Sequence, residues 1–412
     1  MERRLQQTFI FKVSLLSISL FLSMAPQISS ALPLMYGAFP GIDQAGVETL
    51  ATIPNFGIMA GLLISPQLAR LIGKKLTIVL GLVIGLIAGT VPMATDSYIL
   101  ILITRFLLGA GIGLFNSLAV SLIPQFYLED KNELATMIGY QNVMGGVGAA
   151  LASLLVSHLV VISWHAAFGI YLLFIPSLVA FTMFVPLKSH ARHPDEDASR
   201  PGDFEKHPRR INASVIEIAV LMFLIFVFFM PMSFRLPNLV VSEGIGTASQ
   251  IALVGAGTTL VGIPVGMAYG FLFKHLREVL FPLGFGLTTL GFLAVATAPD
   301  LAFLIVAVLV VGVGFGLAVP YVYTWLDQVA PQESINFATT VILVLVNLGC
   351  FVSPMLISAI SSFIGIRGPR AEMLISVVAF AAMFIYAVKH VVNARATRER
   401  ERKERTQISV QR

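Results

Sequence analysis

The stretch Gly109-Ala-Gly-Ile-Gly-Leu114 returns as Gly312-Val-Gly-Phe-Gly-Leu317, 203 residues further along the chain. The same offset relates Ala135-Thr136 to Ala338-Thr339, and an offset of 204 relates Pro33 to Pro237. Single matches among small and apolar residues arise by chance, but several matches at one offset do not. A repeat near half the length of an apolar chain predicts a membrane protein built from two parallel halves.

The composition indicates that lipid surrounds most of the chain. Of the 412 residues, 57% are hydrophobic and only 12% are charged, with a mean hydropathy of +0.87. Soluble domains carry about 25% charged residues. We therefore expect a multi-pass membrane protein.

Apolar runs long enough to cross a bilayer recur about twelve times. Such runs must be helices, because lipid leaves unpaired backbone groups without partners and the runs exceed the length of a barrel strand. The first run comes after the cations Arg3, Arg4 and Lys12, an arrangement also found in cleaved signal peptides. However, the run is longer than the apolar part of a signal peptide, and the seventh run is its equivalent in the second repeat. Both features favour a helix that is retained in the protein. The expected spans are 13–36, 46–68, 76–95, 98–123, 135–160, 166–187, 213–235, 248–273, 279–297, 301–325, 336–362 and 371–392.

These spans predict an all-α membrane fold of two pseudo-symmetric six-helix bundles. The first bundle occupies 1–187 and the second 213–393, joined by a central loop at 188–212 and followed by a charged tail at 394–412. If the N-terminus is cytoplasmic, 23 of the 27 Lys and Arg residues fall on the inner side. The positive-inside rule then places both termini in the cytoplasm of a cell (plasma or inner) membrane. The net charge of +5 reports this topology and contact with anionic lipid, not nucleic-acid binding.

The residues that carry enzyme chemistry are sparse. Cys350 is the one cysteine, the seven His residues form no ligand array, and no H-E-x-x-H or phosphate-binding G-x-x-x-x-G-K-[ST] motif occurs. We expect neither an enzyme nor a metal or other cofactor, only a proton gradient as the energy source, and a monomer as the working unit.

The fourth span contains the most specific motif, Arg105-Phe-Leu-Leu-Gly109-Ala-Gly111-Ile-Gly113. With the 6+6 repeat and the basic turn after the second span, it resembles the major facilitator superfamily, and its twelve-helix drug:proton antiporter type in particular. The resemblance implies a role for Arg105 in proton transfer or substrate binding. An Arg within lipid costs at least about 2.5 kcal/mol, so it should face the bundle interior; a locally paired, purely structural Arg is the alternative.

Glycines at helical spacing predict close helix packing in both halves. In the fifth span the antiporter pattern G-x-x-x-G-P is eroded to Gln141-Asn-Val-Met-Gly145-Gly146, where Gly replaces Pro. That loss weakens the argument for export. The predicted packing glycines are Gly109, Gly113, Gly145, Gly146, Gly312 and Gly316.

The loop after the second span reads Pro66-Gln-Leu-Ala-Arg70-Leu-Ile-Gly73-Lys74-Lys75, with Arg70 at the family's acidic position. The repeat copy has Lys274 there. A cation at this position needs carboxylates, so we expect Arg70 to pair with Asp327 or Glu333, and Lys274 with the acidic residues at 129–133, when the inner side is closed. An equally favoured alternative is that Arg70 and Lys274 form no gate and only fix the orientation of the chain in the membrane, as other cytoplasmic cations do. The predicted cytoplasmic gate comprises Arg70, Gly73, Lys74, Lys274, Asp327, Glu333, Glu129 and Asp130.

Prolines at 26 and 231 interrupt the first and seventh spans near the membrane midplane, where they can frame a substrate site. A few polar and aromatic residues on other spans would line it, which suits an amphipathic organic molecule better than a sugar. Glu217 and Glu48 are the best candidates for a titrating carboxylate, with Glu243 third. An interfacial charge is the alternative for each, and it is the favoured interpretation for Glu48 and Glu243. The predicted proton and substrate pathway comprises Arg105, Glu217, Arg235, Gln27, Asn116, Gln141, Asn142, Tyr321, Trp325 and Asn347.

Together these features predict a secondary active transporter that works by alternating access. Proton-coupled efflux of a small amphipathic organic compound is the favoured activity. Arg105 and Arg235 keep open the uptake or facilitated transport of a small organic anion, and a non-transporting sensor is a further alternative. The intramembrane Arg has no counterpart in the second repeat, where Val308 stands at the matching position.

Overall fold

The computed structural model describes residues 8–127, 131–186, 212–331, 335–366 and 368–410. Every regular element in these ranges is a helix. The first half comprises α2 (Phe9–Ser17), η1 (Ile18–Ser23), η2 (Ala25–Ala31), α3 (Leu32–Ala38), α4 (Gln44–Ile72), α5 (Lys74–Thr90), η3 (Val91–Ala94), α6 (Tyr98–Ser121), α7 (Ile123–Tyr127), α8 (Lys131–Ile162), α9 (Trp164–Ala167), η4 (Phe168–Leu173) and α10 (Phe174–Phe184).

The second half repeats the pattern with longer uninterrupted helices. It comprises α11 (Ala213–Phe229), α12 (Pro231–Ser242), α13 (Ala248–Leu276), η6 (Arg277–Val279), α14 (Leu280–Thr297), α15 (Leu301–Val329), α16 (Ile335–Ile364) and α17 (Pro369–Val410). The last helix runs on through most of the stretch expected as a separate tail at 394–412. The predicted central loop at 188–212 lies almost entirely outside the described residues.

Ten stretches of the described chain are long and apolar enough to cross a membrane, or eleven if a bent pair forms one more span. One of the ten, Ala248–Thr297, contains both α13 and α14, which a turn at Arg277 separates. Counting α13 and α14 singly and the bent pair as one span gives the expected twelve. The predicted all-α membrane fold is confirmed.

Proline breaks the first and seventh spans where the sequence suggested. Pro26 lies in the first turn of η2, and the segments Phe9–Ser23 and Ala25–Ala38 bend by 48°. Pro231 begins α12 directly after α11 ends. Proline lacks an N–H and clashes with the preceding turn, so each span divides there.

Glycine lets α4 and α6 pack with their backbones in contact. A Cβ at Gly109 would overlap the carbonyl oxygen of Pro54, and one at Gly113 would overlap that of Ile58. The facing residues Gly57 and Gly61 are equally crowded by the backbone of α6. This interface is the close small-residue packing that the repeated glycines predicted.

The other predicted glycines pack less closely. A Cβ at Gly145 would lie 3.4 Å from Ser23 Oγ, and Cβ atoms at Gly312 and Gly316 would lie 3.1 Å from side chains of α13. Within the second copy of the repeated motif the crowded glycine is Gly314, whose Cβ would lie 2.5 Å from the backbone nitrogen of Thr288. Gly146 is half-buried.

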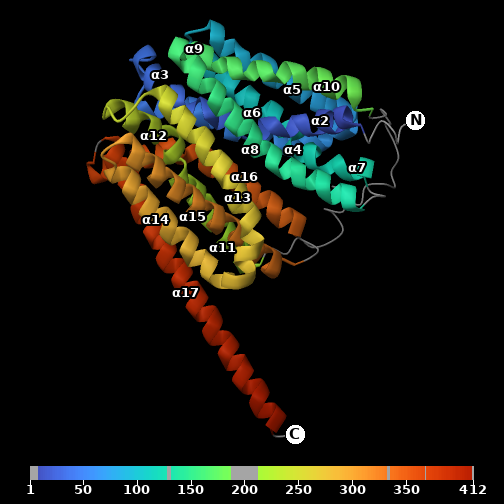
Figure 1. Cartoon of the computed structure of the whole chain (residues 1–412), viewed down its shortest axis with the longest axis vertical. Coiled ribbons are helices and arrows are strands. Elements are labelled where there is room, and N and C mark those ends of the chain that lie inside the picture. The colour runs from blue at the N-terminus through green and yellow to red at the C-terminus, as the bar shows by residue number, and fades with distance from the viewer. Residues whose placement is uncertain (1–7, 128–130, 187–211, 332–334, 367, 411–412) are drawn as a thin grey trace.

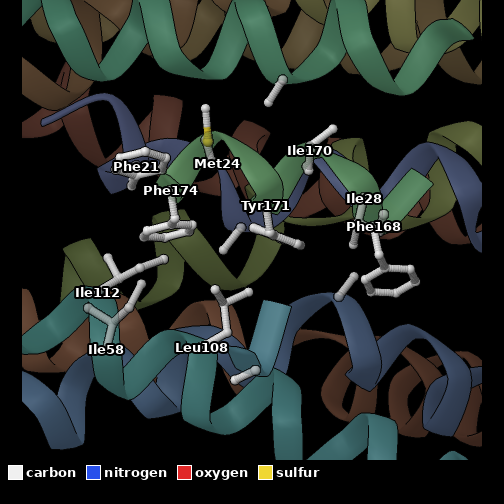
Figure 2. Packing of buried hydrophobic residues seen from close by; sticks show 14 of the residues in the cluster. Phe21, Met24, Ile28, Ile58, Leu108, Ile112, Phe168, Ile170, Tyr171 and Phe174 are labelled. Atoms are coloured by element: carbon white, nitrogen blue, oxygen red, sulfur yellow. The ribbon is translucent and has the colours of Figure 1, made fainter. Parts of the chain in front are cut away.

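Each half has its own apolar core. In the first half Phe21 stacks on Phe174 with ring centroids 3.9 Å apart, above Ile58 and Ile112 (Figure 2). The second core is built from α11 to α17, with Phe281, Phe285 and Phe292 among its largest buried side chains.

The halves meet at one end and diverge at the other (Figure 1). They approach at the end that carries α3 and α12, called here the α3 end. The opposite end, where Arg70, Lys74 and Lys274 lie, is called here the basic end. On α13, a Cβ at Gly255 would touch Ser153 of α8 at 3.5 Å, whereas Gly262 and Gly266 on the same helix face meet no atom within 4 Å. Contact between the halves is therefore lost toward the basic end.

Candidate functional site

A cavity of about 220 Å³ lies between the two halves, beside the proline breaks. Its first-half lining comes from η2 and α8, and its second-half lining from α11, α12, α13 and α15. The side chains that line the cavity are uncharged. Some carry hydroxyl or amide groups, and the others are apolar. The polar members are Gln27, Ser29, Ser30, Ser153, Ser233, Thr258 and Thr259, and Pro26, Phe229, Met232, Leu236 and Pro237 are among the apolar ones.

Gln27 is the predicted pathway residue that lines this cavity. Its Oε1 accepts a hydrogen bond from Ser153 Oγ at 2.6 Å, and its Nε2 donates to the carbonyl of Ser23 at 3.1 Å. The pair joins η2 to α8, and both residues lie in the first half. Substrate hydrogen bonds in the cavity would compete with this arrangement.

Arg105 is completely buried inside the first half and does not line the cavity. Its Nε donates to the carbonyl of Leu50 and its Nη2 to the carbonyl of Ala25, both at 2.8 Å, while Nη1 donates to the hydroxyl of Tyr171. The guanidinium also lies over the Phe168 ring, 5.9 Å from its centroid. Figure 2 shows both aromatic residues within the core. One side chain thus ties η2, α4, α6 and η4 together, the locally paired alternative raised by the sequence.

Arg235 lies at the centre of a buried charge cluster that joins the two halves at the α3 end. Its Nη1 lies 2.8 Å from Glu48 Oε1 on α4, and its Nε lies 2.7 Å from Glu372 Oε2 on α17. The side chains are 1%, 0% and 8% exposed for Arg235, Glu48 and Glu372. Nη2 donates to Ser358 Oγ at 2.8 Å. Leu236 and Pro237, which follow Arg235 in α12, line the cavity, so the cluster is adjacent to it.

Polar side chains from both halves complete this cluster. Tyr36 donates its hydroxyl to Glu48 Oε1 at 2.8 Å, and Gln44 donates to the same oxygen at 3.2 Å. Ser361 donates to Glu372 Oε1 at 3.2 Å. Glu48 Oε2 is buried and has no hydrogen-bond partner among the described residues. Glu372 Oε2 also has no hydrogen-bond partner there, but it lies in the ion pair with Arg235 Nε. Two carboxylates therefore share one guanidinium, and Glu48 Oε2 is left with neither a hydrogen bond nor a described ion pair.

Glu243 and Glu217, the other two predicted titrating carboxylates, lie outside the Arg235 cluster. Glu243 pairs with Arg370 at 3.3 Å on the surface of the α3 end, and Arg370 also donates to the carbonyls of Ala296 and Ala298. Glu217 accepts a hydrogen bond from the Tyr386 hydroxyl at 2.5 Å within the second half. Neither lines the cavity.

The remaining pathway residues lie away from the cavity. Tyr321 and Trp325 pack in the second core, where Tyr321 stacks on Phe281 and Trp325 lies against His390. Asn347 donates to the carbonyl of Leu343 in its own helix, and Gln141 is buried on α8. Asn116 is half-buried on α6, and the side chain of Asn142 is outside the described part.

The predicted gate residues lie at the basic end. Arg70, Lys274 and Asp327 are exposed, and no ion pair involving Arg70 or Lys274 occurs among the described residues. Gly73 ends α4 with a φ of 87°. The expected pairing of Arg70 with Asp327 is thus not formed in this conformation, in which the halves diverge there. The predicted partners Glu129, Asp130 and Glu333 lie outside the described residues.

Lys75, from the same basic motif, has a clear packing role. Its ammonium donates to the carbonyls of Thr182 and Val185 at 3.0 and 2.9 Å. These carbonyls end α10, where a positive charge is favourable.

Sequence reasoning missed Glu372, Tyr36 and the hydroxyl residues of the cavity. The sequence could have indicated Glu372, because an acidic residue at the start of the last apolar span is unusual. It could not have indicated the serines and threonines of the cavity, since such residues also bond to their own helix backbone throughout the chain.

The geometry is that of a membrane transporter: two helical bundles, a cavity at their interface beside the proline breaks, and a closed and a divergent end. The sequence profile of the Major Facilitator Superfamily matches residues 13–354 and 218–410. The chain belongs to this superfamily and is not an enzyme. A search of curated protein sequences finds no match.

Solved structures show the same fold at low sequence identity. The nucleoside transporter NupG is 11% identical with a TM-score of 0.70, over 93% of this chain and 99% of its own. A POT family transporter in complex with 5-aminolevulinic acid is 12% identical with a TM-score of 0.74, over 95% and 99%. An auto-inhibited POT family peptide transporter is 14% identical with a TM-score of 0.71, over 93% and 96%. These similarities show that the chain has the fold of these transporters.

Proposed function

We propose that this transporter works by alternating access and exports a small, uncharged or amphipathic organic molecule in exchange for protons. The observation that carries the proposal is the closure of one end of the interface by the Arg235 cluster, beside a cavity, while the halves diverge at the other end. By the positive-inside rule the basic end faces the cytoplasm of the cell membrane. The cavity then belongs to an inward-facing state.

The lining of the cavity supports the substrate class. Its side chains offer hydroxyl and amide groups next to Phe229 and Met232, but no charge. A ligand with hydrogen-bonding groups and one apolar face would match this surface. Among the ligands named for the similar structures, an uncharged nucleoside fits it better than a peptide with charged termini.

The same observations weigh against the small-anion alternative. That reading depended on Arg105 and Arg235 as anion-binding groups. Both guanidinium groups are buried and already bonded to carbonyl, hydroxyl or carboxylate oxygens. Releasing either group for a ligand would leave buried acceptors unpaired, which is costly.

A flux assay in proteoliposomes tests the proposal. Labelled nucleosides, amphipathic cations and small organic anions are loaded separately, and efflux is followed with and without an imposed proton gradient. We expect the gradient to accelerate efflux of an uncharged or amphipathic compound. Gradient-independent transport, or transport of organic anions alone, would contradict the proposal.

A further inference from the structure

The Arg235 cluster has more negative than positive charge. Glu48 and Glu372 both contact one guanidinium, so the fully ionised cluster buries a net charge of −1. Burying an unbalanced charge is expensive, whereas a neutral carboxyl that keeps its hydrogen bonds is tolerated. Two carboxylates that share a site commonly retain one proton between them.

The two carboxylates differ in what happens when the α3 end opens. Glu372 and Arg235 belong to the same half, where α12 packs on α17. Glu48 belongs to the other half and would separate from them together with its neighbours Tyr36 and Gln44. Opening therefore leaves Arg235 and Glu372 as a neutral pair and exposes Glu48 to water.

We propose that Glu48 is the proton site of this transporter, and that it takes up one proton from the solution at the α3 end as that end closes. The step forms one O–H bond on the Glu48 carboxyl, takes the proton from water-borne hydronium and changes the cluster's net charge from −1 to 0. The bare Glu48 Oε2 is the atom that is costly to bury as an anion. This inference rests on the alternating-access function proposed above.

The groups that face Glu48 among the described residues support a neutral carboxyl there. Tyr36 from α3 and Gln44 from α4 donate to its Oε1, Arg235 from α12 contacts the same oxygen, and Glu372 from α17 lies across Arg235. Arg235 is the one cation in that set. A cluster that worked as a simple electrostatic latch would instead need Glu48 ionised, so acid would open the end.

The direction of coupling follows from this step. A proton that enters from the outer solution promotes closure of the outer end and so opening toward the cytoplasm. The proton thus favours the return to the inward-facing state, in which outgoing substrate binds. Exchange further requires that this proton leave Glu48 through the adjacent cavity, which Leu236 and Pro237 line, to the basic end before the α3 end reopens. Proton entry is then opposed to substrate exit.

A distance measurement between spin labels tests the proton site without any substrate. Gly41 lies in the loop before α4 and Ser242 ends α12; both are exposed at the α3 end and lie in different halves. The labelled protein carries Gly41→Cys, Ser242→Cys and Cys350→Ser, and is reconstituted in lipid nanodiscs. We expect a short distance at acidic pH and a growing long-distance population at alkaline pH.

Two variants should remove this pH dependence and hold the end closed. Glu48→Gln mimics the protonated carboxyl, and Glu372→Gln leaves Arg235 balanced by Glu48 alone. Glu243→Gln is the matched control at the same end and should keep the wild-type response, since Glu243 pairs outside the cluster. An end that opens in acid, a Glu48→Gln or Glu372→Gln variant that keeps the wild-type response, or a distance insensitive to pH would overturn the proposal.

The flux assay separates this inference from the proposed function. Proton-driven transport with a pH-insensitive distance would refute Glu48 as the proton site but not the transport function. A pH-dependent distance that Glu48→Gln abolishes, without any flux, would refute the function alone.

Discussion

Arg105 Nη1 donates a hydrogen bond to the hydroxyl of Tyr171 within the core of the first half, and neither residue lines the cavity. The guanidinium also satisfies two backbone carbonyls, at Leu50 and Ala25. These three acceptors lie on different elements, so the planar fork of an Arg suits them and a single ammonium does not. We conclude that Arg105 holds the first half together.

Arg105→Lys should therefore destabilise the protein while leaving substrate affinity nearly unchanged. Tyr171→Phe removes one of the three bonds and should cost less, about 0.6–1.7 kcal/mol by comparison with other hydrogen bonds in membranes. Thermal unfolding in detergent measures the first effect, and the KM of the remaining transport measures the second. A stable Arg105→Lys protein with a greatly raised KM would instead return Arg105 to the substrate pathway.

The repeated glycines allow a matched comparison between the halves. Gly109→Ala places a methyl group against the Pro54 carbonyl, where backbone must move, so we expect a marked loss of thermal stability. Gly312→Ala, at the equivalent repeat position, meets only the Thr258 methyl at 3.1 Å and should lower stability much less. Equal effects in both halves would show that the two packing interfaces are alike.

The repeated glycines show which parts of the fold can be predicted from the sequence and which cannot. Hydropathy and the repeat offset predicted the helices, the spans and a close-packing face at Gly109 and Gly113, because each depends on local pattern or on repeat symmetry. They did not predict that α4 is the helix packed on that face. Gly314 is crowded by α14 as its repeat equivalent Gly111 is by α5, whereas Gly312 lies farther from α13 than Gly109 does from α4, so one of the two glycine contacts is looser in the second half. The partners of Arg235 come from residues 48 and 372, and only the folded chain brings them together.

The cavity gives the most direct prediction for substrate binding. Ser153→Ala removes the hydroxyl that bonds Gln27 and faces the cavity. We expect a several-fold change in KM with little loss of protein stability, because lost polar contacts in membranes are worth about 1 kcal/mol. Ser157→Ala, one turn further along α8, removes a hydroxyl bonded to its own helix and is the control. If both variants shifted KM equally, the effect would belong to α8 as a whole and not to the cavity.

The orientation of the chain can be tested with the same single-cysteine strategy. In a Cys350→Ser background, Ser242→Cys lies at the α3 end and Leu71→Cys at the basic end, and both positions are exposed. If the basic end faces the cytoplasm, a membrane-impermeant maleimide will label Ser242→Cys in intact cells and Leu71→Cys only after the membrane is opened. The opposite labelling would invert the topology. It would also turn the Glu48 cluster toward the cytoplasm, so that Glu48 would exchange its proton with the inner solution as that end closes. An inward proton gradient would still drive the substrate out of the cell, because the gradients set the direction of an exchange. The labelling pattern therefore decides from which side of the membrane Glu48 takes up its proton.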